Sequence, residues 1–296
     1  MPKGNPSPLK LYSLIGAMTT LWSINYVIAK FALREFPALL LTSLRMVIAG
    51  LIMIAIYLWS TRRGTERRFE RSDIPLLITL GLLGVGLNQT LFVLGISRTS
   101  VAHASIMIAL TPVIVLVLAA LAGQEKLRPV KLFGMAIAMC GVGLLQFTSS
   151  SDRTASVTGD FLIFLCSVTF AIFAVRGKGQ AGRVSGILIN TFAYGGTGLV
   201  LLPVALYLSR DFPYAHVSAI AWTSLLYMVV FPSIVCYLIY YYALRYLPAS
   251  RITAFSYLQP LIATLTAIPF LSEQPGKSLL FGGALVLTGV FIAERV

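Results

Sequence analysis

Two stretches of the chain, 148 positions apart, decide the fold. Residues 110–142 read LTPVIVLVLAALAGQEKLRPVKLFGMAIAMCGV, and residues 258–290 read LQPLIATLTAIPFLSEQPGKSLLFGGALVLTGV. They align without a gap, and they share a proline, a glutamate, a Phe-Gly pair and a Gly-Val pair. Outside these stretches, the same shift matches Lys30 with Lys178 and Gly50 with Gly198. The sequence therefore predicts two repeats, one over residues 1–148 and the other over residues 149–296.

The composition is that of a membrane protein. Of the 296 residues, 57% are hydrophobic and 11% are charged, whereas soluble domains carry about 25% charged residues. So few charges cannot cover so much apolar surface in water, which excludes a soluble enzyme and a disordered chain. The net charge of +13 comes from basic residues scattered over short loops, which is not the continuous basic face of a nucleic-acid binder.

Apolar runs of about 20 residues, the length of a membrane-spanning helix, occur ten times. Because a bilayer offers no water to backbone groups, these runs must be helical. We expect an all-α integral membrane protein whose spans cover residues 11–30, 38–58, 74–96, 101–122, 129–148, 160–176, 186–207, 217–243, 250–271 and 276–293.

Loop charges set the orientation of these spans. Sixteen of the 23 lysines and arginines fall on one side and six on the other, so the positive-inside rule places both termini in the cytoplasm. Five spans in each half make the two repeats enter the membrane in opposite senses. Inverted repeats are typical of alternating-access transporters, which bind their substrate near the midplane. The alternative is that the repeat builds a bundle without a pathway.

Polar and aromatic residues inside the spans are the candidates for lining such a pathway. The alternative for each of them is helix packing or a hydrogen bond between helices. We expect Pro112 and Pro260, at matching positions, to bend their helices. The candidate cavity residues are Trp22, Asn25, Tyr26, Asn88, Phe92, Met107, Thr111, Phe170, Phe173, Tyr237, Tyr240, Phe255 and Gln259.

Arg45 is the one charge well inside a span, and Ala193 replaces it in the second half. A buried guanidinium needs a partner, so Arg45 either ties backbone carbonyls or holds a substrate carboxylate; we favour the structural role. All ten acidic residues lie in loops or near span ends. The cavity is therefore predicted to be neutral and aromatic, without a proton relay. Three cysteines and two histidines show no ligand spacing, so we expect no metal and no cofactor.

Several motifs resemble those of a known family. The segments Leu21–Asn25, Thr42–Arg45, Leu110–Pro112, Gly123–Leu127 and Gly141–Leu145 are similar to an EamA domain, and the second half repeats the pattern in Leu258–Pro260, Ser272-Glu273 and Gly289-Val290. The chain resembles the drug/metabolite transporter superfamily, most closely the YddG-type amino acid exporters. This resemblance implies ten helices in two inverted halves, usually located in the bacterial inner membrane, and the export of metabolites.

The sequence thus favours a secondary transporter that exports amino acids or related neutral or zwitterionic metabolites, without tight proton coupling. We expect a small-molecule substrate, a lipid environment, no nucleic acid and a functional monomer. A multidrug or toxic-cation efflux protein of the same superfamily is the alternative, and it would need a negatively charged site. A membrane enzyme would need a clustered nucleophile, base or metal set. A structural membrane subunit predicts no transport at all.

Overall fold

A computed structural model describes residues 6–66, 69–147, 156–262, 265 and 277–295. Within these ranges all extended regular structure is helical, which confirms the predicted all-α class. The first half contains α1 (Pro8–Leu33), α2 (Ala38–Arg62), η1 (Arg71–Asp73), α3 (Ile74–Gly81), η2 (Leu82–Leu87), α4 (Asn88–Ile96), α5 (Val101–Ala109), α6 (Thr111–Leu121) and α7 (Pro129–Phe147). The second half contains α8 (Val157–Gln180), α9 (Gly186–Ser209), η3 (Tyr214–His216), α10 (Ala219–Met228), η4 (Val229–Val235), α11 (Cys236–Leu244), α12 (Ala249–Ala254), η5 (Phe255–Tyr257) and α14 (Lys277–Arg295).

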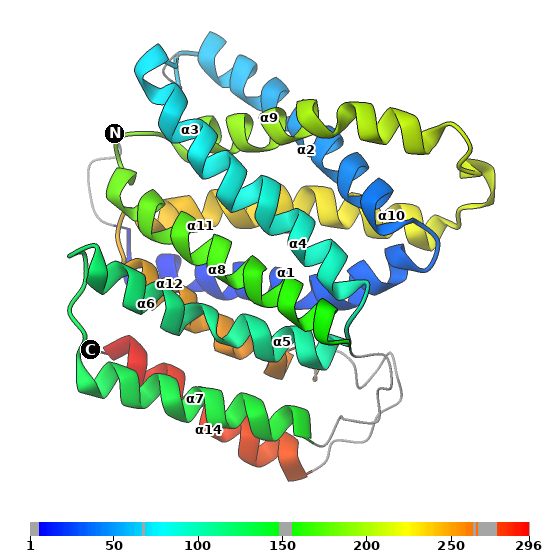
Figure 1. Ribbon diagram of the computed structural model, residues 1–296. Coiled ribbons are helices and arrows are strands. Elements are labelled where there is room, and N and C mark those ends of the chain that lie inside the picture. Colours follow the sequence, from blue (N-terminus) through cyan, green and yellow to red (C-terminus); the bar gives the residue numbers. More distant parts are fainter. Residues whose placement is uncertain (1–5, 67–68, 148–155, 263–264, 266–276, 296) are drawn as a thin grey trace.

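The long helices lie side by side in one bundle, and both termini are at the same end (Figure 1). We call this end the terminus end and the other the opposite end. Among the described residues, seven helical runs are long and apolar enough to cross a membrane, and two shorter apolar helices accompany them. The predicted span over residues 250–271 lies partly outside the described residues.

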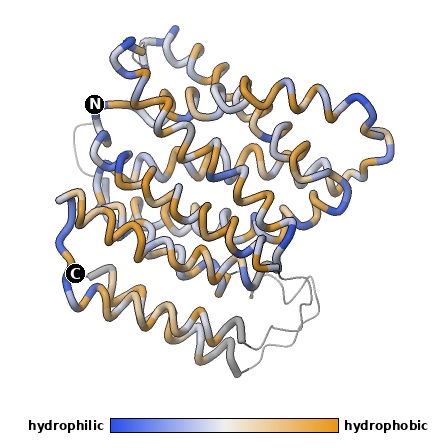
Figure 2. Tube along the Cα trace, viewed as in Figure 1, coloured by the Kyte–Doolittle hydropathy of each residue, from blue (hydrophilic) through white to orange (hydrophobic). Residues whose placement is uncertain are grey.

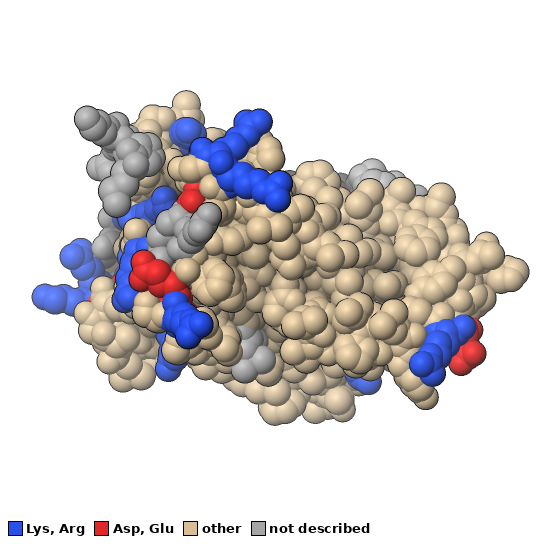
Figure 3. All heavy atoms as spheres, turned by 90° about the horizontal axis from the view of Figure 1, so that it is seen from above, with Lys and Arg blue, Asp and Glu red and all other residues tan. Residues whose placement is uncertain are grey.

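Charge and hydropathy are segregated along the bundle. Apolar residues fill the helical middles, and hydrophilic residues lie at the ends and in the connections (Figure 2). On the face shown in Figure 3, the middle of the molecule is almost without charge, and lysine and arginine gather mainly over one end. Large apolar side chains in the middle of α9, such as Leu199 and Val200, are more than 70% exposed. Such exposure is stable only if the surroundings are apolar too.

Short polar signals set where several helices begin and end. Ser100, Ser156, Ser185 and Ser218 each accept the backbone N–H three residues later, at 3.1–3.2 Å, and so cap α5, α8, α9 and α10. Each cap satisfies a donor that the first helical turn leaves free. After α6, Gly123 adopts a φ of +69°, a left-handed conformation that favours glycine and stops the helix.

Helices at matching positions of the two halves pack against each other in antiparallel fashion. A Cβ atom on Gly50 of α2 would lie 2.8 Å from the Tyr194 carbonyl oxygen of α9, and one on Gly198 would lie 2.8 Å from the Met46 oxygen. Gly141 of α7 approaches Gly282 of α14 equally closely. Small residues allow this close backbone contact in a lipid environment. The two halves therefore meet at glycines that the repeat had already paired.

Two spans that the sequence predicts as single α-helices, residues 74–96 and 217–243, each contain a π-helical turn. η2 interrupts the first span, and η4 interrupts the second at the matching position. Such turns leave backbone carbonyls without their usual helical donor and are frequent at functional sites. The predicted span 101–122 is also divided, since α5 ends at Ala109 and α6 begins at Thr111, just before Pro112.

Candidate functional site

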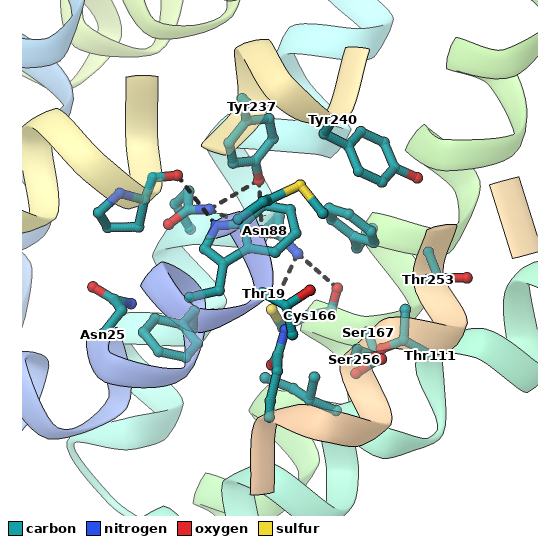
Figure 4. Close-up of a pocket in the computed structure, with 18 of the residues that line it drawn as sticks. Thr19, Asn25, Asn88, Thr111, Cys166, Ser167, Tyr237, Tyr240, Thr253 and Ser256 are labelled. Carbon is teal, nitrogen blue, oxygen red and sulfur yellow. Dashed lines mark hydrogen bonds between the residues drawn. The ribbon is translucent and has the colours of Figure 1, made fainter. Parts of the chain in front are cut away.

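A cavity of about 100 Å³ lies inside the bundle, between the two halves (Figure 4). The first half contributes side chains from α1, α2, α4, α5 and α6, and the second half contributes them from α8, η4, α11, α12 and η5 and from Gln259. The lining residues are Met18, Thr19, Trp22, Asn25, Tyr26, Arg45, Asn88, Gln89, Phe92, Ile108, Thr111, Cys166, Ser167, Phe170, Pro232, Tyr237, Tyr240, Ile252, Thr253, Ser256 and Gln259.

Most of the residues predicted from the sequence meet at this cavity, although their role there stays a prediction. Three do not line it: Met107, Phe173 and Phe255. Phe173 is fully buried against Tyr240 and Tyr241. Those that do line it are Trp22, Asn25, Tyr26, Asn88, Phe92, Thr111, Phe170, Tyr237, Tyr240 and Gln259.

Helix breaks explain two of the misplaced residues. The prediction assumed unbroken α-helices, in which Met107 shares a face with Thr111 and Phe255 shares one with Gln259. The break at Leu110 changes the first register, so that Ile108 rather than Met107 reaches the cavity. The 3₁₀ turn η5 changes the register between Phe255 and Gln259. A 3₁₀ turn has three residues instead of 3.6, so the side chains that follow it point in a different direction.

Aromatic rings form one wall of the cavity, and several contacts join counterparts in the repeat. Trp22 meets Phe170, its counterpart 148 residues later, edge to face with ring centroids 5.9 Å apart. Tyr237 lies 5.8 Å from Trp22 and accepts a hydrogen bond of 2.9 Å from the amide of Gln89, its own counterpart. The cavity therefore lies where the two repeats face each other.

Some of the polar lining is already satisfied by the protein itself. The Asn88 amide donates to the Cys166 carbonyl oxygen at 2.8 Å, and its oxygen accepts from the Gln89 amide at 3.2 Å. The Tyr26 hydroxyl donates to the Gln259 side-chain oxygen at 2.9 Å. These bonds tie helices of the two halves together, so these groups contribute to the architecture of the site.

Side chains of the cavity also satisfy the carbonyls of the two π-turns. The Tyr237 hydroxyl donates to the Gly84 oxygen in η2 at 2.6 Å, and the Trp22 indole N–H donates to the Pro232 oxygen in η4 at 3.3 Å. Gly84 and Pro232 are counterparts in the repeat. Each half therefore inserts an aromatic donor into the π-turn of the other, which couples the cavity wall to both interruptions.

Other polar atoms at the cavity are free. Asn25 Oδ1, Tyr240 Oη, Ser256 Oγ and the Arg45 nitrogens Nη1 and Nη2 are buried and have no hydrogen-bond partner among the described residues. Such orphans are uncommon in proteins and need an explanation. None of the lining side chains is acidic, so the cavity is uncharged apart from Arg45. The described residues also contain no group of three or more His, Cys, Asp or Glu suited to a metal ion.

Arg45 is fully buried in α2, and one edge of its guanidinium is used structurally. Its Nε donates to the Met228 carbonyl oxygen at 3.1 Å and to Ser233 Oγ at 2.8 Å. The Met228 oxygen is free for this bond because Pro232, four residues later, has no N–H. For this edge of the guanidinium, the geometry agrees with the structural role favoured from the sequence, a tie to backbone carbonyls.

A buried ion pair joins the halves at the terminus end. Lys131 Nζ, at the start of α7, lies 2.8 Å from Glu125 Oε2 and 2.5 Å from Ser250 Oγ of α12. The Glu125 and Lys131 side chains are only 10% and 8% exposed. Ser250 also donates both its N–H and its hydroxyl to Glu125. Nearby, Lys178 donates to the Leu247 carbonyl oxygen at 2.9 Å.

More exposed contacts join the halves at the opposite end. His103 Nδ1 lies 2.9 Å from Asp160 Oδ2, and these side chains are 43% and 23% exposed. The Thr99 hydroxyl donates to the other oxygen of Asp160. Lys30 donates to the Thr99 carbonyl oxygen at 2.6 Å, just as its counterpart Lys178 does to Leu247, the counterpart of Thr99.

Sequence reasoning missed the cavity residues that carry little chemical signal. Small and aliphatic residues such as Thr19, Ser256 and Ile252 cannot be told from helix-packing residues by type. Gln89 did carry a signal, since it is a polar residue beside Asn88 in the same span and it matches Tyr237 in the repeat. The lysine counterparts Lys30 and Lys178 were a second usable signal, because a lysine near a span end that recurs in both halves needs an acceptor.

The sequence of the chain matches a known protein family. The family model described as the EamA-like transporter family matches the chain twice, over residues 9–147 and 157–294. The chain belongs to the EamA-like transporter family, within the drug/metabolite transporter superfamily. Membership of this family makes the chain a membrane transporter. The two matched segments correspond to the two halves of the bundle.

Two relatives match 77% and 95% of the chain. The Bacillus subtilis (strain 168) protein named uncharacterized transporter YetK is 25% identical over 95% of this chain and 85% of its own length. A probable terminal-alkyne amino-acid exporter of Streptantibioticus cattleyicolor is 28% identical over 77% of this chain and 76% of its own length. A crystal structure at 21% identity covers 95% of this chain and 96% of its own, with a TM-score of 0.76, and shares the fold.

Proposed function

We propose that the chain exports amino acids or related small zwitterionic metabolites across the inner membrane of a bacterial cell. It works as a monomer by alternating access, with both termini in the cytoplasm. The observation that carries this proposal is the cavity between the halves, whose aromatic and amide lining contains no carboxylate. Such a lining, with Arg45 as its one charged side chain among the described residues, suits a small solute of zero net charge. One relative carries an amino-acid exporter name, which agrees with this substrate class.

The cavity also favours movement down a concentration gradient without tight proton coupling. A proton relay needs ionisable groups along the path, whereas the described residues that line the cavity include no carboxylate, and Glu125 and Asp160 already hold partners at the two ends of the bundle. The orientation rests on the gathering of lysine and arginine at one end (Figure 3), which the positive-inside rule assigns to the cytoplasm.

Flux in proteoliposomes tests the proposal. Purified protein is reconstituted, and the release of radiolabelled amino acids is followed with and without an imposed pH gradient. We expect release that is equal in both conditions. Strict dependence on the gradient would contradict the uncoupled mechanism, and the absence of flux for every amino acid would contradict amino acid export.

Asn25 gives a sharp variant, because its free side-chain oxygen ties no helices together. We expect Asn25→Ala to lower the initial flux about tenfold, the effect of losing one polar contact to the solute. The control is Trp59→Ala at the lipid-facing end of α2, where the side chain is 56% exposed. This variant should keep its flux, and equal losses in both variants would remove Asn25 from the site.

A further inference from the structure

One edge of the Arg45 guanidinium has no partner in the protein. Its Nε edge is fixed by the Met228 oxygen and by Ser233, which orients the whole planar group. Nη1 and Nη2, on the other edge, carry four N–H donors between them. Both nitrogens are buried and have no hydrogen-bond acceptor among the described residues, while Arg45 contributes to the wall of the cavity.

The positive charge of this group is also unbalanced. An arginine side chain keeps its proton inside proteins, and a buried charge without a counter-charge is strongly unfavourable in a membrane. The side chains that line the cavity include no carboxylate that could balance it. The bond from Nε to the π-turn explains why α2 has a donor here, but a neutral side chain could supply that donor. The charge itself is left for a ligand.

We propose that Nη1 and Nη2 of Arg45 bind the carboxylate of the transported solute. This inference rests on the proposed function, which it narrows from small zwitterions to solutes that carry a carboxylate. A carboxylate accepts two parallel N–H bonds from the outer edge of a guanidinium. The geometry thus uses both edges of Arg45, one for the protein and the other for the ligand.

The charge balance favours a carboxylate over a phosphate. Arg45 is the only lysine or arginine among the residues that line the cavity. One positive charge balances the single negative charge of a carboxylate, whereas a phosphate would bring up to two. The rest of the cavity suits the remainder of an amino acid. Asn25 Oδ1 is a free acceptor for an ammonium group, and the Trp22 and Phe170 rings offer faces that attract cations.

Ligand series on the unmodified protein provide the first test. L-leucine, L-phenylalanine and L-alanine are each compared with their methyl ester and with the amine that lacks the carboxyl group. Binding is measured as the dissociation constant obtained from the rise in thermal unfolding temperature over a series of ligand concentrations. We expect at least one acid to bind about tenfold or more tightly than its ester and its amine.

Two variants separate ligand binding from the structural role of Arg45. Arg45→Gln removes the charge and should bring the ratio of acid to ester affinity close to one. Ser233→Ala removes a contact of the Nε edge but leaves the charge, and it should keep the preference for the acid. The ratio is independent of the amount of folded protein. If Arg45→Gln does not fold, the ligand series and Ser233→Ala still decide.

Two results would overturn the inference: esters or amines that bind as tightly as the acids, or an acid preference that survives in Arg45→Gln. Flux of the amines without flux of the acids would overturn it as well, while leaving the chain a transporter. Absence of flux for every solute would instead contradict the proposed function, so that the two failures are distinguishable.

Discussion

The contacts that join the two halves differ between the two ends of the bundle. At the terminus end, Glu125 and Lys131 form an ion pair that is about nine-tenths buried. At the opposite end, His103 and Asp160 form a pair that is open to water. Removing one partner of a buried pair is strongly destabilising, because the other charge remains buried and unpaired. Exposed pairs contribute about 0–1 kcal/mol.

This difference bears on how an alternating-access protein moves. In the proposed alternating-access mechanism, opening the terminus end would separate the nine-tenths buried Glu125 carboxylate from Ser250 and leave the carboxylate without that donor. Opening the opposite end transfers its polar groups to water that already reaches them. We therefore expect the opposite end to open more readily in the absence of solute, and each of the following predictions tests the contrast.

The largest effect is expected at Glu125. Glu125→Ala leaves Lys131 buried without a counter-charge and should lower the free energy of unfolding by about 3–5 kcal/mol. Thermal unfolding in detergent measures the loss, and hydrogen exchange of α12 should rise, because Ser250 loses its acceptor. Adding Lys131→Met to this variant should restore part of the stability, since the unpaired charge is removed.

The control for this variant is Asp211→Ala, which removes an exposed carboxylate in the connection between α9 and α10. It should leave unfolding and α12 exchange unchanged. Strictly additive effects of Glu125→Ala and Lys131→Met would mean that the pair is not coupled, and the contrast between the ends would disappear.

A smaller effect is expected at Asp160. Asp160→Asn keeps an acceptor for the Thr99 hydroxyl but removes the charge that faces His103. Because water screens this pair, we expect a loss of less than about 1 kcal/mol. Thermal unfolding under the conditions used for Glu125→Ala gives the comparison. A loss as large as that of Glu125→Ala would show that exposure does not separate the two ends.

The smallest effect concerns Glu35, in the connection between α1 and α2 at the opposite end. Hydrogen bonds from the Ser218 hydroxyl, at 2.5 Å, and the Ser218 N–H, at 2.6 Å, lower the pKa of this carboxyl below its ordinary value. A lowered pKa means that the contact stabilises the fold above the usual glutamate range and is lost as pH falls through the folded-state pKa.

Glu35→Gln should therefore be less stable than the parent protein at neutral pH, and the difference should vanish on acidification. The variant leaves the Ser218 cap of α10 in place. Unfolding temperatures over a pH series measure the effect. A difference that stays constant from neutral to acidic pH would contradict the role of the Glu35 carboxylate.

Much of the fold was predictable because the bilayer restricts the choices. Without water, an apolar run of about 20 residues becomes a helix, and the gap-free matches Gly50 with Gly198 and Gly141 with Gly289 identified residues that lie at helix contacts. Trp22 and Phe170 were predicted at the cavity because polar and aromatic side chains deep in a span are few. Their place at the cavity follows from the structure, and their contact with a solute stays a prediction.

The interruptions of the helices were not predictable from hydropathy, since a π-turn has the same apolar residues as the helix around it. Pro232 and Gly84 occupy the same position in the repeat, yet only proline removes an N–H. Without that N–H, the Met228 oxygen accepts from Arg45 and from the Ser233 hydroxyl. Arg45 and Pro232 are far apart in the sequence, and only the folded structure brings the arginine to the π-turn that contains the proline.

The contacts between counterpart residues have a consequence for the history of the chain. Trp22 touches Phe170 and Gln89 bonds to Tyr237, so a change in one copy of the ancestral unit alters the environment of the very same position in the other copy. The two halves therefore cannot diverge independently at these contacts. A substitution at any of these four positions therefore changes the surroundings of its counterpart as well.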